Sequence, residues 1–269
     1  MLPKGYICWG EVNEARNSFT RYLQTFPEGA FSLNANYYIG LIDYNQKAYD
    51  SAAEHLDKVL EYPNNKYSED AMLMSAEMAY TAKNYEKALN VYKQLKDKAA
   101  SQERRQLAKT GVLRSAHMLG NGEEVILAAT DLLSDSKLSP ELSNEAHYYR
   151  AKVYLDEGKT EGAMDDLKVL AADTRNVYGA EAKYKVAQIY FDAGQTDKAE
   201  QEVLNYIEVS TPHTYWLARS FVLLADVYMK LGRNLDAKQY LLSLKQNYQA
   251  DDDIAGMIES RLEKLKVEN

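Results

Sequence analysis

The sequence contains little cysteine, proline or glycine, and each shortage limits what the chain can be. One cysteine, Cys8, among 269 residues excludes an internal disulfide framework and any metal site built from several thiolates. Only 5 prolines and 13 glycines interrupt the chain, which leaves room for long helices. No apolar run approaches the roughly 18 residues of a membrane-spanning helix, so we expect no direct membrane insertion.

Positive charge is also in short supply. The chain has 32 Lys and Arg residues against 40 Asp and Glu residues, which gives a formal net charge of −8 at pH 7. Nucleic acids and anionic lipids are bound through clustered Lys and Arg, so we expect no nucleic-acid partner. The hydrophobic share of 46% is that of a globular protein and argues against wholesale disorder.

Catalytic and ligand-binding motifs are missing from the sequence. The four histidines lie far apart and show none of the spacings that bind metals. Glycine-rich phosphate loops and nucleophile elbows do not occur. Cys8 has no activating neighbour and is interpreted as a packing residue. These observations predict a chain that is not an enzyme and that holds no cofactor and no metal.

What the chain does contain is a repeat of about 37 residues. In each copy a turn precedes a small residue near the start of a helix, at Ala15, Ala52, Ala88, Val125, Ala163, Ala199 and Ala237. Glycine occupies five of these turns, at Gly10, Gly120, Gly158, Gly194 and Gly232, and Lys47 and Lys83 occupy the other two. Glycine suits a helix end that needs a left-handed residue. Because strand-like alternation is absent, the pattern predicts an all-α chain.

The first helix of the repeat, which precedes this turn, carries in five copies a small residue where two helices would meet. These residues are Gly40, Ala76, Ala151, Ala187 and Ala225. Tyrosine follows three residues later in three copies, at Tyr154, Tyr190 and Tyr228, where we expect it to fill the space beside the contact. Hydroxyl residues followed by proline or acids predict helix starts at Ser68, at Ser139-Pro140 and at Thr211-Pro212.

The order of small residue, tyrosine, turn glycine, alanine and inter-helix proline resembles the tetratricopeptide repeat family. The resemblance covers residues 6–250 and implies a right-handed α-solenoid superhelix of tandem helix hairpins. It implies an incomplete first repeat over residues 1–27 and six repeats over 28–63, 64–100, 101–138, 139–174, 175–211 and 212–250. The incomplete repeat leads us to expect a fragment of a longer protein. The apolar stripe Ile254, Ile258, Leu262 and Leu265 predicts a capping helix over residues 251–269.

The resemblance also implies which side chains face a ligand groove, because the family builds that groove from the first helix of each repeat. The candidates are Tyr37, Leu41, Tyr44, Glu77, Tyr80, Arg114, His117, Tyr148, Lys152, Tyr184, Gln188, Phe191, Asp226 and Met229. Tyrosine combines a large contact area with a hydroxyl that can hydrogen-bond, which makes it a good interface residue. The positions of the family's clamp for a terminal carboxylate hold Tyr37, Leu41, Leu73 and Glu77, so that clamp is absent.

Two interpretations of the groove cations remain open. Arg114 and Lys152 could together bind a carboxylate of a partner, or they could form salt bridges with Glu77 or Glu145. The resemblance as a whole implies a non-catalytic protein–protein interaction scaffold that binds a peptide or a partner protein in a Tyr-rich groove. The alternative is a structural or oligomerisation segment of a longer repeat protein, with self-association through its open N-terminal end.

A narrower resemblance concerns residues 27–63. The repeat ends Phe26-Pro27 and Tyr62-Pro63 and the helix NANYYIGLIDYNQ are similar to repeats of envelope proteins of Gram-negative bacteria. Those proteins include the periplasmic Tol-Pal-associated coordinator and the repeat lipoprotein of the outer-membrane assembly machine. This resemblance implies a periplasmic or outer-membrane-associated location within a bacterial cell-envelope assembly, with the cytoplasm as the alternative.

Overall fold

The computed structural model describes residues 9–62, 64–209 and 211–267, and the regular structure in these ranges is α-helical throughout. The helices are α1 (Trp9–Thr25), α2 (Ser32–Asn45), α3 (Tyr49–Leu60), α4 (Ser68–Thr81), α5 (Tyr85–Lys98), α6 (Gln102–Met118), α7 (Gly122–Leu133), α8 (Pro140–Asp156), α9 (Thr160–Leu170), α10 (Val177–Asp192), α11 (Thr196–Glu208), α12 (Thr214–Lys230), α13 (Asn234–Asn247) and α14 (Ile254–Val267). The packing role expected of Cys8 falls outside the described residues.

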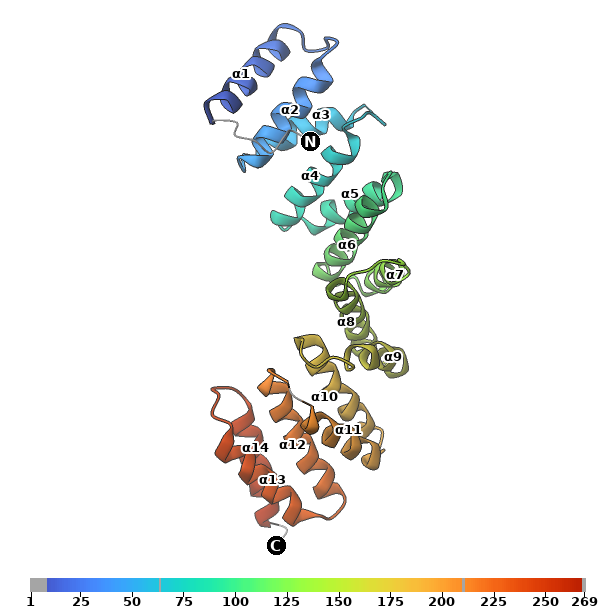
Figure 1. Ribbon diagram of the computed structural model, residues 1–269, viewed down its shortest axis with the longest axis vertical. Helices are drawn as coiled ribbons and strands as arrows, with labels where there is room; N and C mark the ends of the chain where they lie inside the picture. Colours follow the sequence, from blue (N-terminus) through green and yellow to red (C-terminus); the bar gives the residue numbers. More distant parts are fainter. Residues whose placement is uncertain (1–8, 63, 210, 268–269) are drawn as a thin grey trace. The chain divides into compact units, whose positions relative to one another are not determined.

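The helices form two compact units, Met1–Asp135 with α1–α7 and Ser136–Asn269 with α8–α14. Within each unit, consecutive helices pack as pairs (Figure 1). The pairs are α2–α3, α4–α5 and α6–α7 in the first unit and α8–α9, α10–α11 and α12–α13 in the second. Each unit is therefore built as an all-α helical repeat solenoid.

The turns inside the helix pairs need a left-handed residue, as expected from the glycine pattern. Gly120, Gly158, Gly194 and Gly232 have φ angles of 66°, 71°, 74° and 74°. Lys47 and Lys83 occupy the same place with φ angles of 62° and 59°, although their Cβ atoms make this conformation less favourable. Gly10 differs from the expectation, because it lies in the first turn of α1 and not in a turn between helices.

Close helix contact in the first unit depends on a glycine. A Cβ atom placed on Gly40 would lie 2.8 Å from Cδ2 of Leu56, closer than two carbon atoms can approach without a shift. Leu56 and its neighbours Ala52 and Val59 on α3 are fully buried against α2. The absence of a side chain at Gly40 thus lets α2 and α3 pack tightly.

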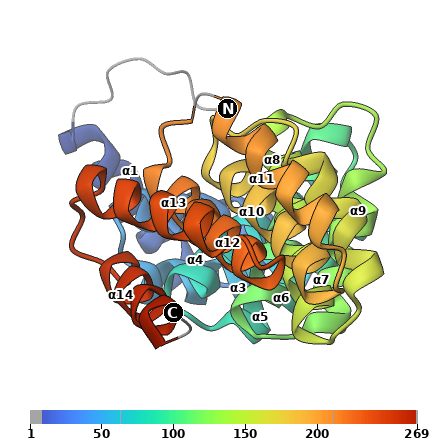
Figure 2. The same ribbon diagram turned by 90° about the horizontal axis from the view of Figure 1, so that it is seen from below.

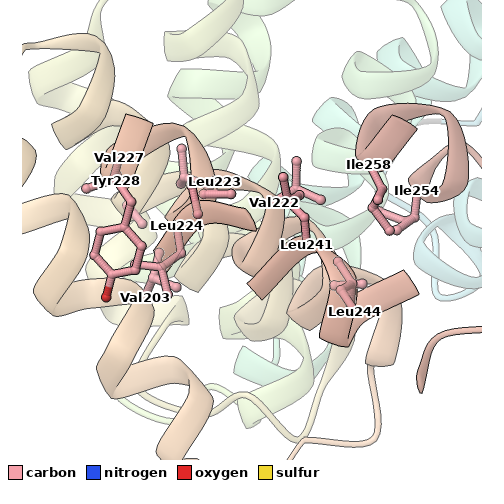
Figure 3. Close-up of a cluster of buried hydrophobic side chains, with 14 of the residues drawn as sticks. Val203, Val222, Leu223, Leu224, Val227, Tyr228, Leu241, Leu244, Ile254 and Ile258 are labelled. Carbon is pink, nitrogen blue, oxygen red and sulfur yellow. The ribbon is translucent and has the colours of Figure 1, made fainter. Parts of the chain in front are cut away.

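The core of the second unit is largest where α12, α13 and α14 lie side by side (Figures 1 and 2). Figure 3 shows its buried side chains Val203, Val222, Leu223, Leu224, Val227, Tyr228, Leu241, Leu244, Ile254 and Ile258. Helix α14 buries the whole stripe expected from the sequence, whereas Glu259 and Glu263 on its other face are exposed to solvent. A helix with one apolar and one polar face can cover the end of a repeat stack.

Helix starts follow the expected cap chemistry at one site and differ at another. Ser139 caps α8 as expected, because its hydroxyl accepts a hydrogen bond from the Leu142 N–H at 3.3 Å. The prediction that Ser68 caps α4 is wrong, because the N-cap residue is Tyr67 and Ser68 is the first helical residue. The preceding turn is instead closed by Asn65, whose side-chain oxygen accepts the Tyr67 N–H at 2.8 Å.

The helix start expected at Thr211-Pro212 is also displaced. Helix α12 begins at Thr214 with His213 as its N-cap, so Pro212 lies before the helix. The Thr211 hydroxyl donates to the Thr174 carbonyl at 2.9 Å and accepts the His213 N–H at 3.2 Å. It therefore ties two loops together and does not cap the helix at its first turn.

Candidate functional site

The first unit contains a cavity of about 780 Å³, which we call the first-unit cavity. It lies along α2 and α4 and reaches Arg104 in the first turn of α6. Its lining side chains include four tyrosines, three apolar side chains from α2 and α4, and four charged groups. They are Tyr37, Tyr38, Leu41, Tyr44, Asn45, Lys66, Tyr67, Asp70, Leu73, Met74, Glu77 and Arg104.

One wall of the first-unit cavity is aromatic. The rings of Tyr37 and Tyr67 stack with centroids 4.0 Å apart and planes 11° apart. Tyr38 meets the Tyr37 ring edge-on at 5.3 Å. Because Tyr37 and Tyr67 are each only 8% exposed, they fix the shape of this wall and offer a ligand little more than their edges.

A tyrosine–glutamate pair joins α2 to α4 inside the same cavity. The Tyr44 hydroxyl donates to Oε2 of Glu77 at 2.5 Å, the length of a charge-assisted O–H···O⁻ bond. Burial and this hydrogen bond raise the pKa of Tyr44 far above its ordinary value, so the phenol keeps its proton at neutral pH. Glu77 and Tyr44 were both expected in the groove.

A second acid, Asp70, lies two turns earlier on α4. The Tyr37 hydroxyl donates to Oδ2 of Asp70 at 3.3 Å, and Arg104 Nη2 donates to Oδ1 of the same carboxylate at 2.6 Å. Burial, followed by the charge of Asp70, raises the pKa of Tyr37 to about 12. The charge of Asp70 is thus balanced by Arg104.

The remaining first-unit candidates lie outside this cavity. Tyr80 packs edge-on against Tyr85 with ring centroids 5.2 Å apart. Arg114 is exposed and His117 is half-buried on α6, and neither lines the first-unit cavity. Their assignment to a ligand groove stays a prediction.

The second unit contains a smaller cavity of about 170 Å³ between α8 and α10, the second-unit cavity. Two expected residues, Tyr148 and Lys152, line it together with Glu181 and Lys185. The Tyr148 hydroxyl donates to Oε2 of Glu181 at 3.1 Å. Burial and then the charge of Glu181 raise the pKa of Tyr148 to about 12. Because Arg114 belongs to the other unit, the pairing of Arg114 with Lys152 stays a prediction.

The other second-unit candidates are engaged in contacts within the fold. Tyr184 is 6% exposed and its hydroxyl donates to Gln188 at 2.9 Å. Lys230 lies 5.0 Å from the ring centroid of Phe191. Asp226 receives two hydrogen bonds from Arg261 of α14, at 2.8 and 2.7 Å, which tie α12 to the last helix. These contacts stabilise the second unit. The assignment of these residues to a ligand groove stays a prediction.

Several cavity residues were missed by the sequence analysis. Asp70, Lys66, Tyr67 and Arg104 line the first-unit cavity without having been expected there. Asp70 stands 33 residues after Tyr37, the same separation as between Tyr44 and Glu77. A search for tyrosine and acid pairs at that separation would have found it.

A buried cluster of ionisable groups joins α8 and α9 in the second unit. Asp166 on α9 is 2% exposed and accepts hydrogen bonds from Arg150 at 2.9 and 2.7 Å, and His147 Nδ1 lies 2.7 Å from it. Burial alone would raise the pKa of Asp166, but the hydrogen bonds from Arg150 and His147 outweigh it and lower the pKa. The carboxylate is fully engaged, which is typical of a structural ion cluster.

The described residues were also searched for a metal site and for a membrane-spanning helix. Among them, no group of three or more His, Cys, Asp or Glu side chains is placed to hold a metal ion. None of the described helices has the length and apolar character needed to cross a membrane.

Comparison with known proteins identifies the repeat. The family model described as tetratricopeptide repeat matches residues 70–101, and a second model of the same description matches residues 218–246. Among curated proteins, none matches the chain.

Solved structures share the architecture at low sequence identity. A structure of Naa15/Naa10 bound to HypK-THB is 16% identical with a TM-score of 0.60 and covers 94% of this chain and 36% of that chain. A tetratricopeptide repeat protein from Parabacteroides merdae is 15% identical with a TM-score of 0.47, over 94% of this chain and 93% of that one. PilW, a type IV pilus biogenesis factor, is 19% identical with a TM-score of 0.46, over 92% and 98%. Two segments of the chain, one in each compact unit, thus match the tetratricopeptide repeat, and the fold is an all-α helical repeat solenoid.

Proposed function

We propose that the chain is a non-catalytic scaffold that binds a peptide or a segment of a partner protein in the first-unit cavity. Solenoid repeats generally serve as extended surfaces for protein–protein interaction. The observation that carries the proposal is the size and lining of this cavity, about 780 Å³ with four tyrosines beside Leu41, Leu73 and Met74. Such a mixture of aromatic area and aliphatic side chains is typical of binding hot spots.

A selection from a random peptide library displayed on phage, with the purified chain as bait, tests the proposal. We expect enriched peptides that bind the wild type and that lose at least tenfold in affinity, about 1.4 kcal/mol, when Tyr44→Ala and Leu41→Ala are combined. The matched control is Leu242→Ala, which removes an exposed apolar side chain of the second unit. Enriched peptides that bind the double variant as tightly as the wild type would contradict this site.

A second candidate function is self-association through α1. In the described part of α1, every side chain from residue 11 to 25 is at least partly exposed, and the apolar Val12, Phe19 and Leu23 are half-buried. Half-covered apolar surface on one helix can pack against a second copy. Light scattering over a concentration series should show a dimer that Val12→Asp with Leu23→Asp converts to a monomer. A monomer at all concentrations would count against this candidate.

We also propose a location in the bacterial cell envelope, on the strength of the resemblance carried by residues 27–63. The resemblance concerns the repeat ends and the helix that contains Tyr37 and Tyr44. Fractionation of the producing cells, with detection by an antibody against the chain, tests this proposal. Recovery in the cytoplasmic fraction alone would overturn it.

A further inference from the structure

We propose that the partner segment bound in the first-unit cavity is an amphipathic α-helix, which presents apolar side chains at positions i+3 and i+4 between polar residues at i and i+7. This inference rests on the function proposed above and specifies the conformation and side-chain pattern of the ligand. It follows from the order in which polar and apolar side chains line α2 and α4.

Two hydrogen bonds between tyrosine and acid set α2 and α4 in parallel register. The Tyr37 hydroxyl donates to Asp70 at 3.3 Å. Seven residues further along both helices, the Tyr44 hydroxyl donates to Glu77 at 2.5 Å. A step of seven residues along α2 therefore matches the same step along α4, which requires that the two helices run in the same direction. Seven residues span about two helical turns, so these two polar contacts lie roughly 10.5 Å apart along the helix axes.

An apolar layer lies between the two polar contacts. Leu41 of α2 stands four residues after one tyrosine and three residues before the other, so it lies on the same face of the helix. Leu73 and Met74 occupy the corresponding places on α4, between the two acids. All three side chains line the cavity. Along the helix axes, the cavity wall is thus polar, then apolar, then polar, with the spacing of an α-helix.

A ligand helix matches this spacing, and an extended chain does not. Residues i and i+7 of a helix lie about 10.5 Å apart on one face, with i+3 and i+4 between them. In an extended strand, the side chains of one face recur every ~6.6–7 Å, so the second polar contact would fall between two of them. Packed helices fit together through rows of side chains that share the three- and four-residue spacing. The wall therefore complements one face of a helix.

The backbone of the ligand leads to the same conclusion. An extended peptide carries N–H and C=O groups that need partners wherever binding removes them from water. Across the apolar layer these groups would face the side chains of Leu41, Leu73 and Met74. The hydroxyl protons of Tyr37 and Tyr44 are already donated to acids and are not available to peptide carbonyl groups. A helix pairs its own backbone groups and brings only side chains to the wall.

Charge at one end of the cavity refines the pattern. The exposed Lys66 lines the cavity, and its ammonium lies 4.7 Å from the centroid of the Tyr67 ring. Tyr67 in turn stacks on Tyr37, which forms the first polar contact. An Asp or Glu of the ligand helix at this end complements the charge of the lysine. We therefore expect that one of the two polar ligand residues is acidic.

The second-unit cavity has a different pattern. Its tyrosine–acid contact joins Tyr148 to Glu181. Seven residues further along the two helices stand Leu155 and Gln188, in place of a second tyrosine and acid. Leu155 lines this cavity, whose volume is about 170 Å³. We therefore expect helix binding in the first unit only, and Leu155 provides a matched control for Leu41.

The first test is the pattern of residues that a phage selection enriches. The library holds random peptides of about 16 residues, long enough for four helical turns. We expect enriched apolar residues three and four positions from flanking polar residues, one of which is Asp or Glu. Leu41→Ala should weaken binding of the best peptide at least threefold, whereas Leu155→Ala should leave it unchanged. Enrichment at every second position, or unchanged affinity for Leu41→Ala, would overturn the inference.

Changes in the best peptide test its conformation on the unmodified protein. Proline at a central position that the selection leaves variable should lower affinity at least tenfold, because proline breaks a helix. Proline at the first position should have little effect and serves as the control. A covalent link between variable positions i and i+4 should raise affinity at least threefold, because it holds the helix before binding. Full affinity with the central proline, or weaker binding after linking, would overturn the inference and leave the proposed function standing.

The acid assigned to Lys66 has a test of its own. Replacing the enriched acid of the peptide by its amide should weaken binding to the wild type at least threefold and should have little effect on binding to Lys66→Gln. An equal loss on both proteins would overturn this assignment. If the wild type enriches no peptide, the inference and the proposed function fail together.

Discussion

The two compact units share a tyrosine–acid contact and differ in what surrounds it. Tyr44 and Glu77 in the first unit, and Tyr148 and Glu181 in the second, are both 33 residues apart and join the first helices of consecutive helix pairs. The oxygen–oxygen distance is 2.5 Å in the first unit and 3.1 Å in the second, and the cavities measure about 780 and 170 Å³. The repeat period thus decides which residues meet, whereas non-repeated neighbours decide the size and lining of the cavity around them.

Buried aspartates show a second contrast between the units. Asp43 on α2 is bound by Arg16 of α1 at 2.8 Å and by Ser51 of α3 at 2.6 Å, so it joins three helices. Asp166 on α9 is bound by two residues of a single helix, α8. Both aspartates are almost fully buried, but their cations differ in exposure, with side-chain values of 30% for Arg16 and 19% for Arg150.

The largest effect is expected from removing these buried charges. Asp166→Asn leaves the Arg150 cation poorly balanced and should lower the free energy of unfolding by about 3–5 kcal/mol. Asp43→Asn should cost less, because water reaches Arg16 more easily. Urea unfolding followed by circular dichroism measures both values. A larger loss for Asp43→Asn would show that joining three helices matters more than the burial of the cation.

The dependence of stability on pH in the acid range should report the same interactions of Asp43 and Asp166 in the unmodified protein. Contacts with Arg16 and Ser51 outweigh burial and lower the pKa of Asp43, and those with Arg150 and His147 do the same for Asp166. Because the pKa values in the folded protein are lowered, this stabilisation is present above the unfolded value of about 3.9 and is lost as pH falls through the folded values. Asp166→Asn should therefore lose less stability than wild type in this acid range.

The sequence was a good guide to the fold because the fold is periodic. The repeat placed left-handed residues correctly even where lysine replaces glycine, at Lys47 and Lys83. The cap predicted at Ser68 is wrong, because the N-cap is Tyr67 and the side chain of Asn65 closes the preceding turn. Nor did the repeat indicate the division after Asp135, since the period continues across that point.

The candidate site was predicted only in part, because cavity contacts depend on residues distant in sequence. Tyr44 and Glu77, which line the first-unit cavity, were expected together from the repeat resemblance. Arg104 reaches Asp70 from the next repeat, a contact that no local pattern encodes. Asp166 is likewise held by Arg150 of the preceding helix, 16 residues away in sequence.

Substitutions at the close helix contacts should have a smaller effect on stability, and the effect should differ between the two units. Gly40→Ala would place a methyl group 2.8 Å from the buried Leu56, and we expect a net loss of about 1–2 kcal/mol despite the better helix propensity of alanine. One of the corresponding residues of the second unit is Ala151, where Ala151→Gly should cost about 1 kcal/mol through propensity and lost packing. Thermal unfolding checks both variants. Stabilisation by Gly40→Ala would show that Leu56 can move aside.

The tyrosine–acid bonds themselves should contribute less. Tyr44→Phe removes the shorter hydrogen bond and should cost about 1 kcal/mol, a reduced value because both partners are only half-buried. Tyr148→Phe removes the longer bond and should cost about 0.5 kcal/mol. Urea unfolding of the two variants, with Tyr85→Phe as a control for loss of a phenol, measures the difference. Equal losses would mean that the difference in length has no energetic consequence.

The smallest signal is the ionisation of these two phenols at high pH, and it distinguishes the units most directly. An exposed tyrosine ionises near pH 10. The pKa of Tyr148 is raised to about 12, and that of Tyr44 is raised further by burial and by Glu77. Because these pKa values are raised in the folded state, their contribution to stability is complete below about pH 10 and is lost as pH rises through the folded values.

The difference between the tyrosinate absorbance of wild type and Tyr148→Phe should therefore show a midpoint near 12 while circular dichroism still reports folded protein. The corresponding difference for Tyr44→Phe should show no ionisation over that range. If Tyr44 ionises near pH 10 in the folded chain, its hydroxyl is not held by Glu77, and the shorter tyrosine–acid contact does not distinguish the first unit from the second.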